Sequence, residues 1–177
     1  DLSEGTHWIS TVAASGAKLA SEEPQSVEVH VDKTDPVTIL EGAPTGWVNH
    51  PVTLVAVATD ESSGMNPEPG GDPVTVIEPV DQSPYVSPGH TARFTIASEG
   101  ATVVKYWARD LAGNANDGGI APDGDRHRPP CSVTVRIDSV APEAHFLDAA
   151  DRNDPELIKA EVKDRDSGVK DAQIYYR

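Results

Sequence analysis

Apolar and polar side chains alternate along much of this chain, and turn-forming residues interrupt the alternation at short intervals. A period of two residues is typical of β-strands, whereas no segment keeps the 3.6-residue apolar period of an amphipathic helix. We therefore predict an all-β fold with minimal helix. The expected strands cover residues 37–40, 52–59, 74–78, 91–97, 102–109 and 132–137, with a short one near 84–87.

The alternation also indicates which side chains meet the core. In the strand expected over residues 102–109, the even-numbered Val104, Tyr106 and Ala108 should point inward. The odd positions carry Lys105, Trp107 and Arg109, which should point outward. The strand over residues 52–59 is apolar on both faces, so the pattern alone leaves its inward set open.

Two pairs of similar segments indicate an internal repeat. A D-x-x-S-G segment follows an expected strand at residues 60–64 and again at residues 164–168, and the two glycines lie 104 residues apart. The sequence V-E-V-H-V-D ending at Asp32 matches V-T-V-R-I-D ending at Asp138, at an offset of 106 residues. Matches that recur in the same order at one spacing are the sequence signature of a repeat architecture.

The triplet Ser-Glu-Gly adds a third match, because it occurs around Glu4 and again around Glu99, 95 residues apart. The repeating unit is therefore about 100 residues long, which is the size of one small β-sandwich. We divide the chain into the end of one unit (1–32), a complete unit (33–138) and the start of a third (139–177).

Several of these motifs resemble the tandem bacterial immunoglobulin-like (Ig-like) repeats of large extracellular proteins. The resemblance rests on the hinge segments 31–36 (VDKTDP) and 137–142 (IDSVAP) and on the A-x-D-x-x-S-G segment ending at Gly64. It also rests on residues 106–114 (YWARDLAGN), which contain an A-x-D-x-x-G-N turn.

The resemblance implies Ig-like antiparallel β-sandwich repeats, an extracellular or cell-surface location, a stalk or adhesive role and no catalysis. The neighbouring repeats of the same chain would then be the nearest partners. The first unit departs from the pattern, because Ser15 stands where Asp110 would align and the G-N turn is absent. A role for that turn would therefore not extend to every unit.

Charge and composition exclude several function classes. The 177 residues include 29 acidic and 14 basic side chains, a formal net charge of −15. This excess argues against binding to nucleic acid or to an anionic membrane surface, both of which attract basic proteins. No segment has the roughly 20 consecutive apolar residues of a membrane span, so no membrane insertion is expected. The single Cys131 cannot form a disulfide within the chain.

The motifs of common enzyme classes are missing from the sequence. There is no G-x-S-x-G, no H-E-x-x-H, no Walker loop and no dinucleotide fingerprint. The six histidines are scattered singly, without the paired spacing that holds zinc. We therefore expect a protein that is not an enzyme.

Acidic residues at the expected turns form the one constellation with metal-binding chemistry. In an Ig-like sandwich the incoming linker and the loops after the second strand and before the last strand lie at the same end. The oxygen ligands that could meet there for Ca²⁺ are Asp32, Asp35, Asp60, Asp110 and Asn114. The equivalent set at the next hinge is Asp138, Asp164 and Asp166. The alternative is structural, because an Asp before a turn also hydrogen-bonds backbone two residues on.

Three functions remain open at this point. The first is a spacer or adhesive segment of a large secreted or cell-surface protein, with a surface protein or glycan as partner. The second is a carbohydrate-binding or accessory module of a secreted enzyme, with stacking platforms among Trp8, Trp47, Trp107, Tyr85, Tyr175 and Tyr176. The third is assembly by strand exchange, in which partial units at the two ends pair with other copies of the chain.

Overall fold

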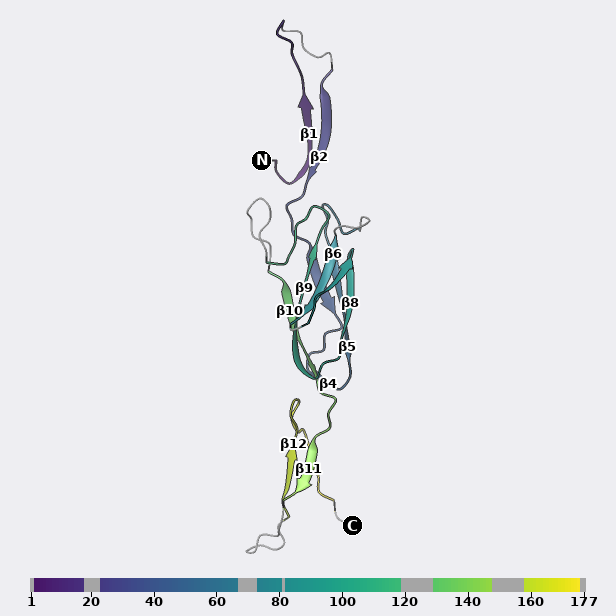
Figure 1. The fold of residues 1–177 in the computed structure, drawn as a ribbon, viewed down its shortest axis with the longest axis vertical. Helices are drawn as coiled ribbons and strands as arrows, with labels where there is room; N and C mark the ends of the chain where they lie inside the picture. Colours follow the sequence, from purple (N-terminus) through teal and green to yellow (C-terminus); the bar gives the residue numbers. More distant parts are fainter. Residues whose placement is uncertain are drawn as a thin grey trace.

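The computed structural model describes residues 2–17, 23–66, 73–80, 82–118, 129–147 and 158–175. The elements follow one another along one long axis (Figure 1). At one end β1 (Gly5–Thr11) and β2 (Gln25–Val31) form an antiparallel hairpin. At the other end β11 (Glu143–Phe146) and β12 (Ala160–Lys163) form a second antiparallel pair. Strands β3 to β10 lie between them and build a β-sandwich.

The sandwich has two sheets. The larger has the order β4-β10-β9-β6-β7, with bounds β4 (Trp47–Val48), β10 (Cys131–Ile137), β9 (Gly100–Arg109), β6 (Val74–Pro79) and β7 (Tyr85–Pro88). The smaller has the order β3-β5-β8, with bounds β3 (Val37–Glu41), β5 (Val52–Thr59) and β8 (Thr91–Ile96). All neighbouring strands are antiparallel except the parallel pair β4–β10.

The all-β prediction is confirmed for the part of the chain that the structure describes, which contains strands and no helix. Each strand expected between residues 37 and 137 is present, with ends within two residues of the predicted ones. Strand β4 was not predicted, because two residues are too short to show an alternation. No described element is a helix long and apolar enough to cross a membrane.

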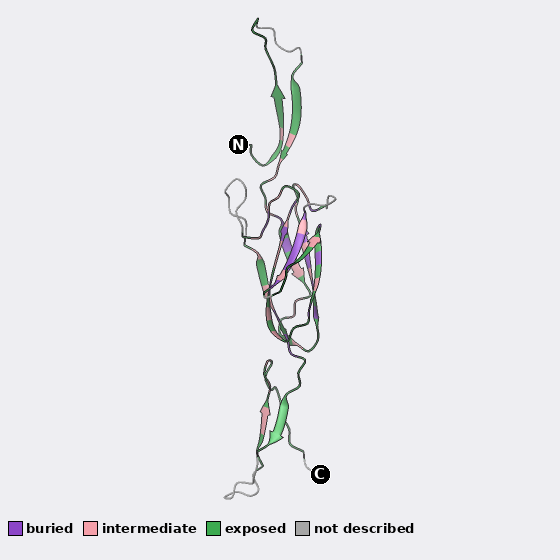
Figure 2. Cartoon of the chain, viewed as in Figure 1, coloured by how far each residue is buried: buried purple, intermediate pink, exposed green. Residues whose placement is uncertain are grey.

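The hydrophobic core lies between the two sheets of the sandwich (Figure 2). Leu54 on β5 and Ile96 on β8 are at most 1% exposed, and they pack with Ile77 and Val104 from the facing sheet. The inward set of β5, which the sequence left open, is therefore its even-numbered side chains. The odd-numbered Val55 is only half-buried.

The outer face of β9 carries the polar side chains that the alternation placed there. Lys105 is exposed, and the guanidinium carbon of Arg109 lies 5.8 Å from the centroid of the Trp107 ring. A cation over an aromatic face is favoured electrostatically, and the contact also covers part of the ring. Trp107 is accordingly half-buried although it does not belong to the core.

The strand pairs β3–β5 and β11–β12 carry different side chains at positions that the repeat offset matches. Ile39 pairs with Val57 across β3 and β5, so this position is aliphatic on both strands. His145 pairs with Glu161 across β11 and β12, and His145 Nε2 lies 3.0 Å from Glu161 Oε2. The ammonium group of Lys163 lies 2.8 Å from the other oxygen of Glu161. This position is therefore apolar in one strand pair and ionic in the other.

Replacing Leu54 with alanine tests where the core lies. Leu54 is fully buried between the sheets, so Leu54→Ala should lower the free energy of unfolding by about 2–5 kcal/mol, measured by urea denaturation. Ile39→Ala is the matched control, because Ile39 is 58% exposed on the neighbouring strand; it should change stability by less than about 0.5 kcal/mol. Equal losses in the two variants would contradict this core.

Candidate functional site

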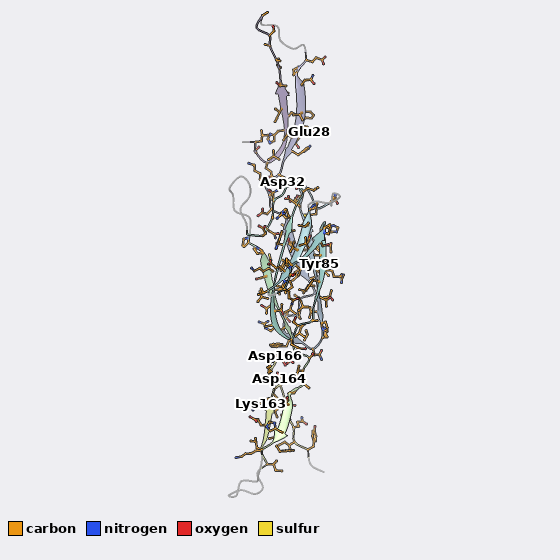
Figure 3. The ribbon with its side chains drawn as sticks, in the orientation of Figure 1. Glu28, Asp32, Tyr85, Lys163, Asp164 and Asp166 are labelled. Carbon is orange, nitrogen blue, oxygen red and sulfur yellow. The ribbon has the colours of Figure 1, made fainter. Side chains whose placement is uncertain are left out.

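Acidic side chains cluster at the two places where the sandwich meets the flanking strand pairs (Figure 3). We call the linker 32–36 between β2 and β3, with its contacts, the first junction. The linker 138–142 between β10 and β11, with its contacts, is the second junction. The labelled Asp32 lies at the first junction, and Asp164 and Asp166 lie at the second.

At the first junction Glu4, just before β1, connects three parts of the chain. Its Oε2 accepts a hydrogen bond of 2.9 Å from the amide of Lys33 in the linker. Its Oε1 accepts hydrogen bonds from the hydroxyls of Thr34 (3.3 Å) and Ser62 (3.1 Å). One carboxylate thus links the β1–β2 hairpin, the linker and the turn that follows β5.

Asp32 joins the linker to the same turn. Its Oδ1 accepts the amide of Thr34 at 2.9 Å, and its Oδ2 accepts the amide of Ser63 at 2.9 Å. Burial raises the pKa of the Asp32 carboxyl, but the hydrogen bonds from Ser63 and Thr34 favour the ionised form more strongly. The net result is a pKa below the usual value, so Asp32 is a carboxylate at neutral pH.

Asp60 explains why the D-x-x-S-G motif has its particular spacing. Its Oδ1 accepts the amides of Ser62 (3.1 Å) and Gly64 (2.8 Å), so the carboxylate closes the turn on itself. Gly64 has a φ of 86°, a left-handed conformation that L side chains rarely adopt. The turn in this shape leaves the amide of Ser63 free to bind Asp32.

Asp110 directly follows β9 and is fully buried. Its Oδ1 accepts the amide of Asn114 at 2.9 Å, and its Oδ2 accepts the Asn114 side-chain amide at 2.9 Å. The same side-chain amide donates to the carbonyl oxygen of Asp32 at 3.3 Å. The turn after β9 is therefore tied both to itself and to the linker.

The pKa of Asp110 moves in the opposite direction from that of Asp32. Burial raises it most, the two hydrogen bonds from Asn114 lower it, and the negative charges of Asp32 and Asp60 raise it further. The net pKa is above the usual value. Ionisation of Asp110 is therefore less favourable in the folded protein than ionisation of an ordinary exposed aspartate.

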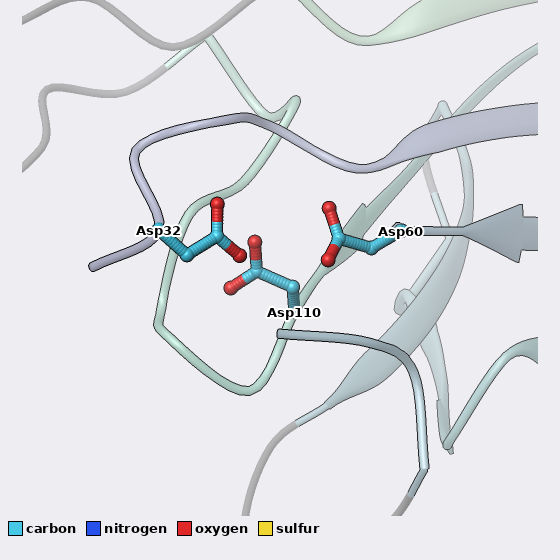
Figure 4. Close-up of side chains that lie close together, drawn as sticks. All are labelled: Asp32, Asp60 and Asp110. Carbon is cyan, nitrogen blue, oxygen red and sulfur yellow. The ribbon is translucent and has the colours of Figure 1, made fainter. Parts of the chain in front are cut away.

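The carboxylates of Asp32, Asp60 and Asp110 point toward one another (Figure 4), with one oxygen of each within 4.8 Å of the others. A groove of about 380 Å³ lies beside them, between the β1–β2 hairpin and the turns of the sandwich. The hydrogen bonds described above reach these three carboxylates from neutral amides. The cluster thus combines hard oxygen atoms with concentrated negative charge, which is the chemistry that Ca²⁺ prefers.

The second junction repeats the role of Glu4. Glu99 stands just before β9, and its Oε2 accepts the amide of Ser139 in the linker at 3.0 Å. Its Oε1 accepts a short hydrogen bond from the Ser139 hydroxyl. As at the first junction, a glutamate next to the first strand of a hairpin holds the linker that leaves that hairpin.

The linker aspartate of the second junction also behaves like its counterpart. Asp138 Oδ1 accepts the amide of Val140 at 3.1 Å, and its Oδ2 accepts the amide of Ser167 at 2.9 Å. The hydrogen bonds from Ser167 are the main reason that the pKa of Asp138 lies below its usual value.

The second D-x-x-S-G turn is closed in the same way as the first. Asp164 Oδ1 accepts the amides of Asp166 (3.2 Å) and Gly168 (2.6 Å), and Gly168 has a φ of 81°. Five backbone hydrogen bonds therefore correspond pair by pair at the two junctions. The D-x-x-S-G segments, matched by sequence alone, lie in equivalent surroundings.

The two D-x-x-S-G turns differ at both x positions, and the change at the second of them alters the contacts of the junction. Ser62, whose hydroxyl donates to Glu4, is replaced in the second turn by Asp166. Asp166 instead places a carboxylate oxygen within 4.8 Å of oxygens of Glu99 and Asp138. The contact between Ser62 and Glu4 at the first junction is a hydrogen bond. The contact between Asp166 and Glu99 at the second junction brings together two groups of like charge.

The structure brings together part of each predicted ligand set. At the first junction Asp32, Asp60 and Asp110 group together, and Asn114 binds Asp110, but Asp35 is not in the group. Asp35 lies three residues beyond Asp32, and the linker turns at Asp32, which hydrogen-bonds the amide of residue 34.

At the second junction, Asp138 and Asp166 group with Glu99, which the predicted set did not include, and Asp164 is not in that group. Of the aromatic platforms considered from the sequence, Tyr176 lies outside the described residues.

Sequence reasoning also missed Asn116, which anchors the turn after β9. Asn116 is 4% exposed, and its Oδ1 accepts the amide of Ala108 at 2.7 Å and the hydroxyl of Thr38 at 3.3 Å. No repeated motif marks Asn116. Glu4 and Glu99 do carry a sequence signal, because both lie in the repeated S-E-G triplet. The repeat alone does not indicate what the glutamate binds.

No protein-family model matches this chain, and a comparison with curated proteins gives no match.

The raised pKa of Asp110 predicts a pH dependence of stability with a defined sign. Its folded-state pKa lies above the ordinary value of 3.8, so the folded state binds the proton more tightly than the unfolded state. The resulting stabilisation is complete below pH 3.8 and is lost as the pH rises through the folded-state pKa.

Asp110→Asn removes this titration. The free energy of unfolding of the wild type, minus that of the variant, should therefore fall as the pH rises over this range. Urea denaturation of both proteins at a series of pH values measures the difference. A difference that is constant or increases with pH would contradict the role of burial at Asp110.

Proposed function

We propose that this chain is a non-catalytic structural or adhesive segment of a large secreted or cell-surface bacterial protein, built from tandem Ig-like β-sandwich units. The observation that carries the proposal is the equivalence of the two junctions. The same five backbone hydrogen bonds occur at each end of the sandwich, around residues that also match in sequence.

The strand registers support the same division into units. Gly5 pairs with Val31 across β1 and β2, and Gly100 pairs with Ile137 across β9 and β10. In this proposal the β1–β2 hairpin is the end of one unit and β9–β10 is the end of the next. Each hairpin then meets the following unit through one glutamate, one linker and one D-x-x-S-G turn.

A joint of this kind suits a spacer. The linker is short, it contains a buried proline at Pro36, and its amides are held by carboxylates of Glu4 and Asp32. Fixing these groups restricts how far one unit can bend relative to the next. The net charge of −15 adds repulsion between units and keeps an extended array soluble.

A variant at Glu4 tests whether the joint orders the hairpin. An isolated two-stranded hairpin is only marginally stable in water, so β1–β2 depends on contacts with the sandwich. Glu4→Ala removes the carboxylate that joins them and should increase amide hydrogen exchange in β1 and β2 several-fold, while exchange in β5 stays unchanged.

Glu28→Ala is the matched control, because Glu28 lies on the same hairpin away from the junction (Figure 3). It should leave exchange near the wild-type rate. Unchanged exchange in Glu4→Ala, or an equal increase in both variants, would argue against a joint built on Glu4.

As a second proposal about the same joint, the first junction binds Ca²⁺ through Asp32, Asp60 and Asp110. It is supported by the grouping of one oxygen from each within 4.8 Å, although these carboxylates also accept backbone amides. The corresponding group at the second junction is Glu99, Asp138 and Asp166. A cation there would offset the mutual repulsion of the carboxylates.

Calorimetric titration of chelator-treated protein with Ca²⁺ tests this binding. Heat release and a higher melting temperature are expected, both reduced in Asp60→Asn and retained in Glu28→Gln, which alters an acidic residue elsewhere. Absence of heat and of any melting shift in the wild type would refute calcium binding and leave the turn-closing role of these aspartates.

The second candidate function is carbohydrate binding, and three of its candidate rings are dispersed over the described fold. A stacking platform needs aromatic rings on one face, and Trp47 and Tyr85 lie on β4 and β7, at opposite edges of the five-stranded sheet. Trp8 is on β1, outside the sandwich. Surface proteins and glycans thus remain partners of the proposed adhesive role without an assigned binding face.

A further inference from the structure

Strand β10 lies beside β4 near one edge of the five-stranded sheet, and β4 covers only the last part of β10. β4 pairs with Arg136 and Ile137, so residues 131–135 pair with β9 on one side and with no described strand on the other. Figure 1 shows β10 along the flank of the sandwich, whereas the pairs β1–β2 and β11–β12 lie beyond its two ends. Neither pair therefore covers residues 131–135, which we call the β10 edge.

One hydrogen bond shows which backbone groups of β10 point away from β9. The amide of Asp138, directly after β10, donates to the carbonyl oxygen of Val48 on β4 at 2.8 Å. Because the backbone groups of successive residues in a strand alternate in direction, the even-numbered residues of β10 point the same way. The amides and carbonyls of Ser132 and Thr134 therefore face the β10 edge, where no backbone hydrogen bond from the described chain reaches them.

The outer face beside the β10 edge carries positive charge, although the chain as a whole has a net charge of −15. Lys105 is exposed and pairs with Ser132 across β9 and β10, so the two side chains lie on one face, and the exposed Arg136 lies on it too. Serine is small, which leaves room for the long Lys105 side chain to extend over it toward the edge. Glu78 pairs with Lys105 across β6 and β9, but the described ion pairs do not include these two side chains.

Together these two features specify one kind of occupant. Amides and carbonyls left open along a strand bind a second extended backbone, and β4 shows that the same side of β10 already accepts a strand further along. Positive charges that reach the edge favour carboxylates on the outward side chains of that segment, which are every second residue. An anionic glycan would meet the charges without extending the ladder of backbone hydrogen bonds, so the combination favours a polypeptide.

We propose that the β10 edge binds an extended acidic segment of a partner protein, which adds a strand beside β10. The backbone of the segment pairs with Ser132 and Thr134, and carboxylates on alternate residues meet Lys105 and Arg136. This inference deepens the adhesive role proposed above and rests on it, because it gives that role a protein partner and a binding face. The edge takes part in neither junction, so binding there leaves the joints between units intact.

The test titrates the isotope-labelled chain of residues 1–177 with a short peptide of alternating Glu and Val, followed by the amide signals in NMR spectra. The signals of the β10 edge should shift first, with a Kd below about 1 mM. A peptide of the same composition, with all Glu residues before all Val residues, carries the same charge without the alternation. It should bind roughly tenfold more weakly, because its carboxylates cannot all lie on the outer face of an added strand.

Two variants separate the backbone contribution from the charge contribution. Thr134→Pro removes an N–H that faces the edge and makes no ladder bond, so a proline is compatible with the strand; it should weaken peptide binding by roughly tenfold or more. Lys105→Glu should also weaken binding by roughly tenfold, because an attraction becomes a repulsion. Arg93→Glu is the matched control, since Arg93 is exposed on β8 in the other sheet, and it should bind like the wild type.

Three results would overturn the proposal: no binding of the alternating peptide, equal binding of the two peptides, or equal losses in Lys105→Glu and Arg93→Glu. Unchanged binding in a folded Thr134→Pro variant would likewise exclude an added strand and leave attraction by charge alone. If Thr134→Pro does not fold, the comparison of the two peptides and of the two charge variants still decides. The Glu4→Ala exchange experiment involves no peptide, so failure of the proposed joint and failure of this binding edge are distinguishable.

Discussion

Carboxylates that accept backbone amides are the interaction on which the arrangement of this chain depends. At each end of the sandwich, a glutamate and an aspartate hold the amides of a linker and a turn that would otherwise bind only water. Hydrogen bonds with an ionised acceptor are stronger than neutral ones, and several act on the same few residues. Without these hydrogen bonds, few contacts would fix the orientation of a two-stranded hairpin relative to the sandwich.

The same carboxylates respond differently to the charge that they concentrate. Asp32 receives amides from two segments, and this solvation by the backbone lowers its pKa despite burial. Asp110 is more deeply buried and faces Asp32 and Asp60, so its pKa rises. Two carboxyls of one cluster thus have pKa values shifted in opposite directions, because the hydrogen bonds together outweigh burial at Asp32, whereas burial and neighbouring charges outweigh the hydrogen bonds at Asp110.

Much of the fold could be predicted from the sequence because strands leave a local signal. The segments that form β5 and β9 are eight residues long or more and rich in β-branched or aromatic side chains, and the turns between strands are rich in Pro, Gly, Asn and Asp. The inward face of β5 could not be predicted, because Val55 and Val57 are as apolar as their neighbours. Only the facing sheet decides which set is buried.

The hydrogen bonds of the junctions were predictable only in part, because some lie within one turn and others join residues far apart in the sequence. Asp60 and Asp164 stand out through a repeated turn motif, whose spacing reflects hydrogen bonds within one turn. Glu4 and Glu99 act on linkers 29 and 40 residues away, and nothing local indicates which amides they bind. The register of β1–β2 and β9–β10 brings them into contact. Long-range partners of this kind depend on strand pairing that the sequence shows only as similarity between segments.

The difference between the paired positions Ile39–Val57 and His145–Glu161 has a broader consequence. In the proposed array, the junction contacts involve only the ends of a sandwich, so the exposed faces of its strand pairs take no part in how one unit attaches to the next. An exposed pair can then be aliphatic in one unit and charged in another without a change in the distance between units.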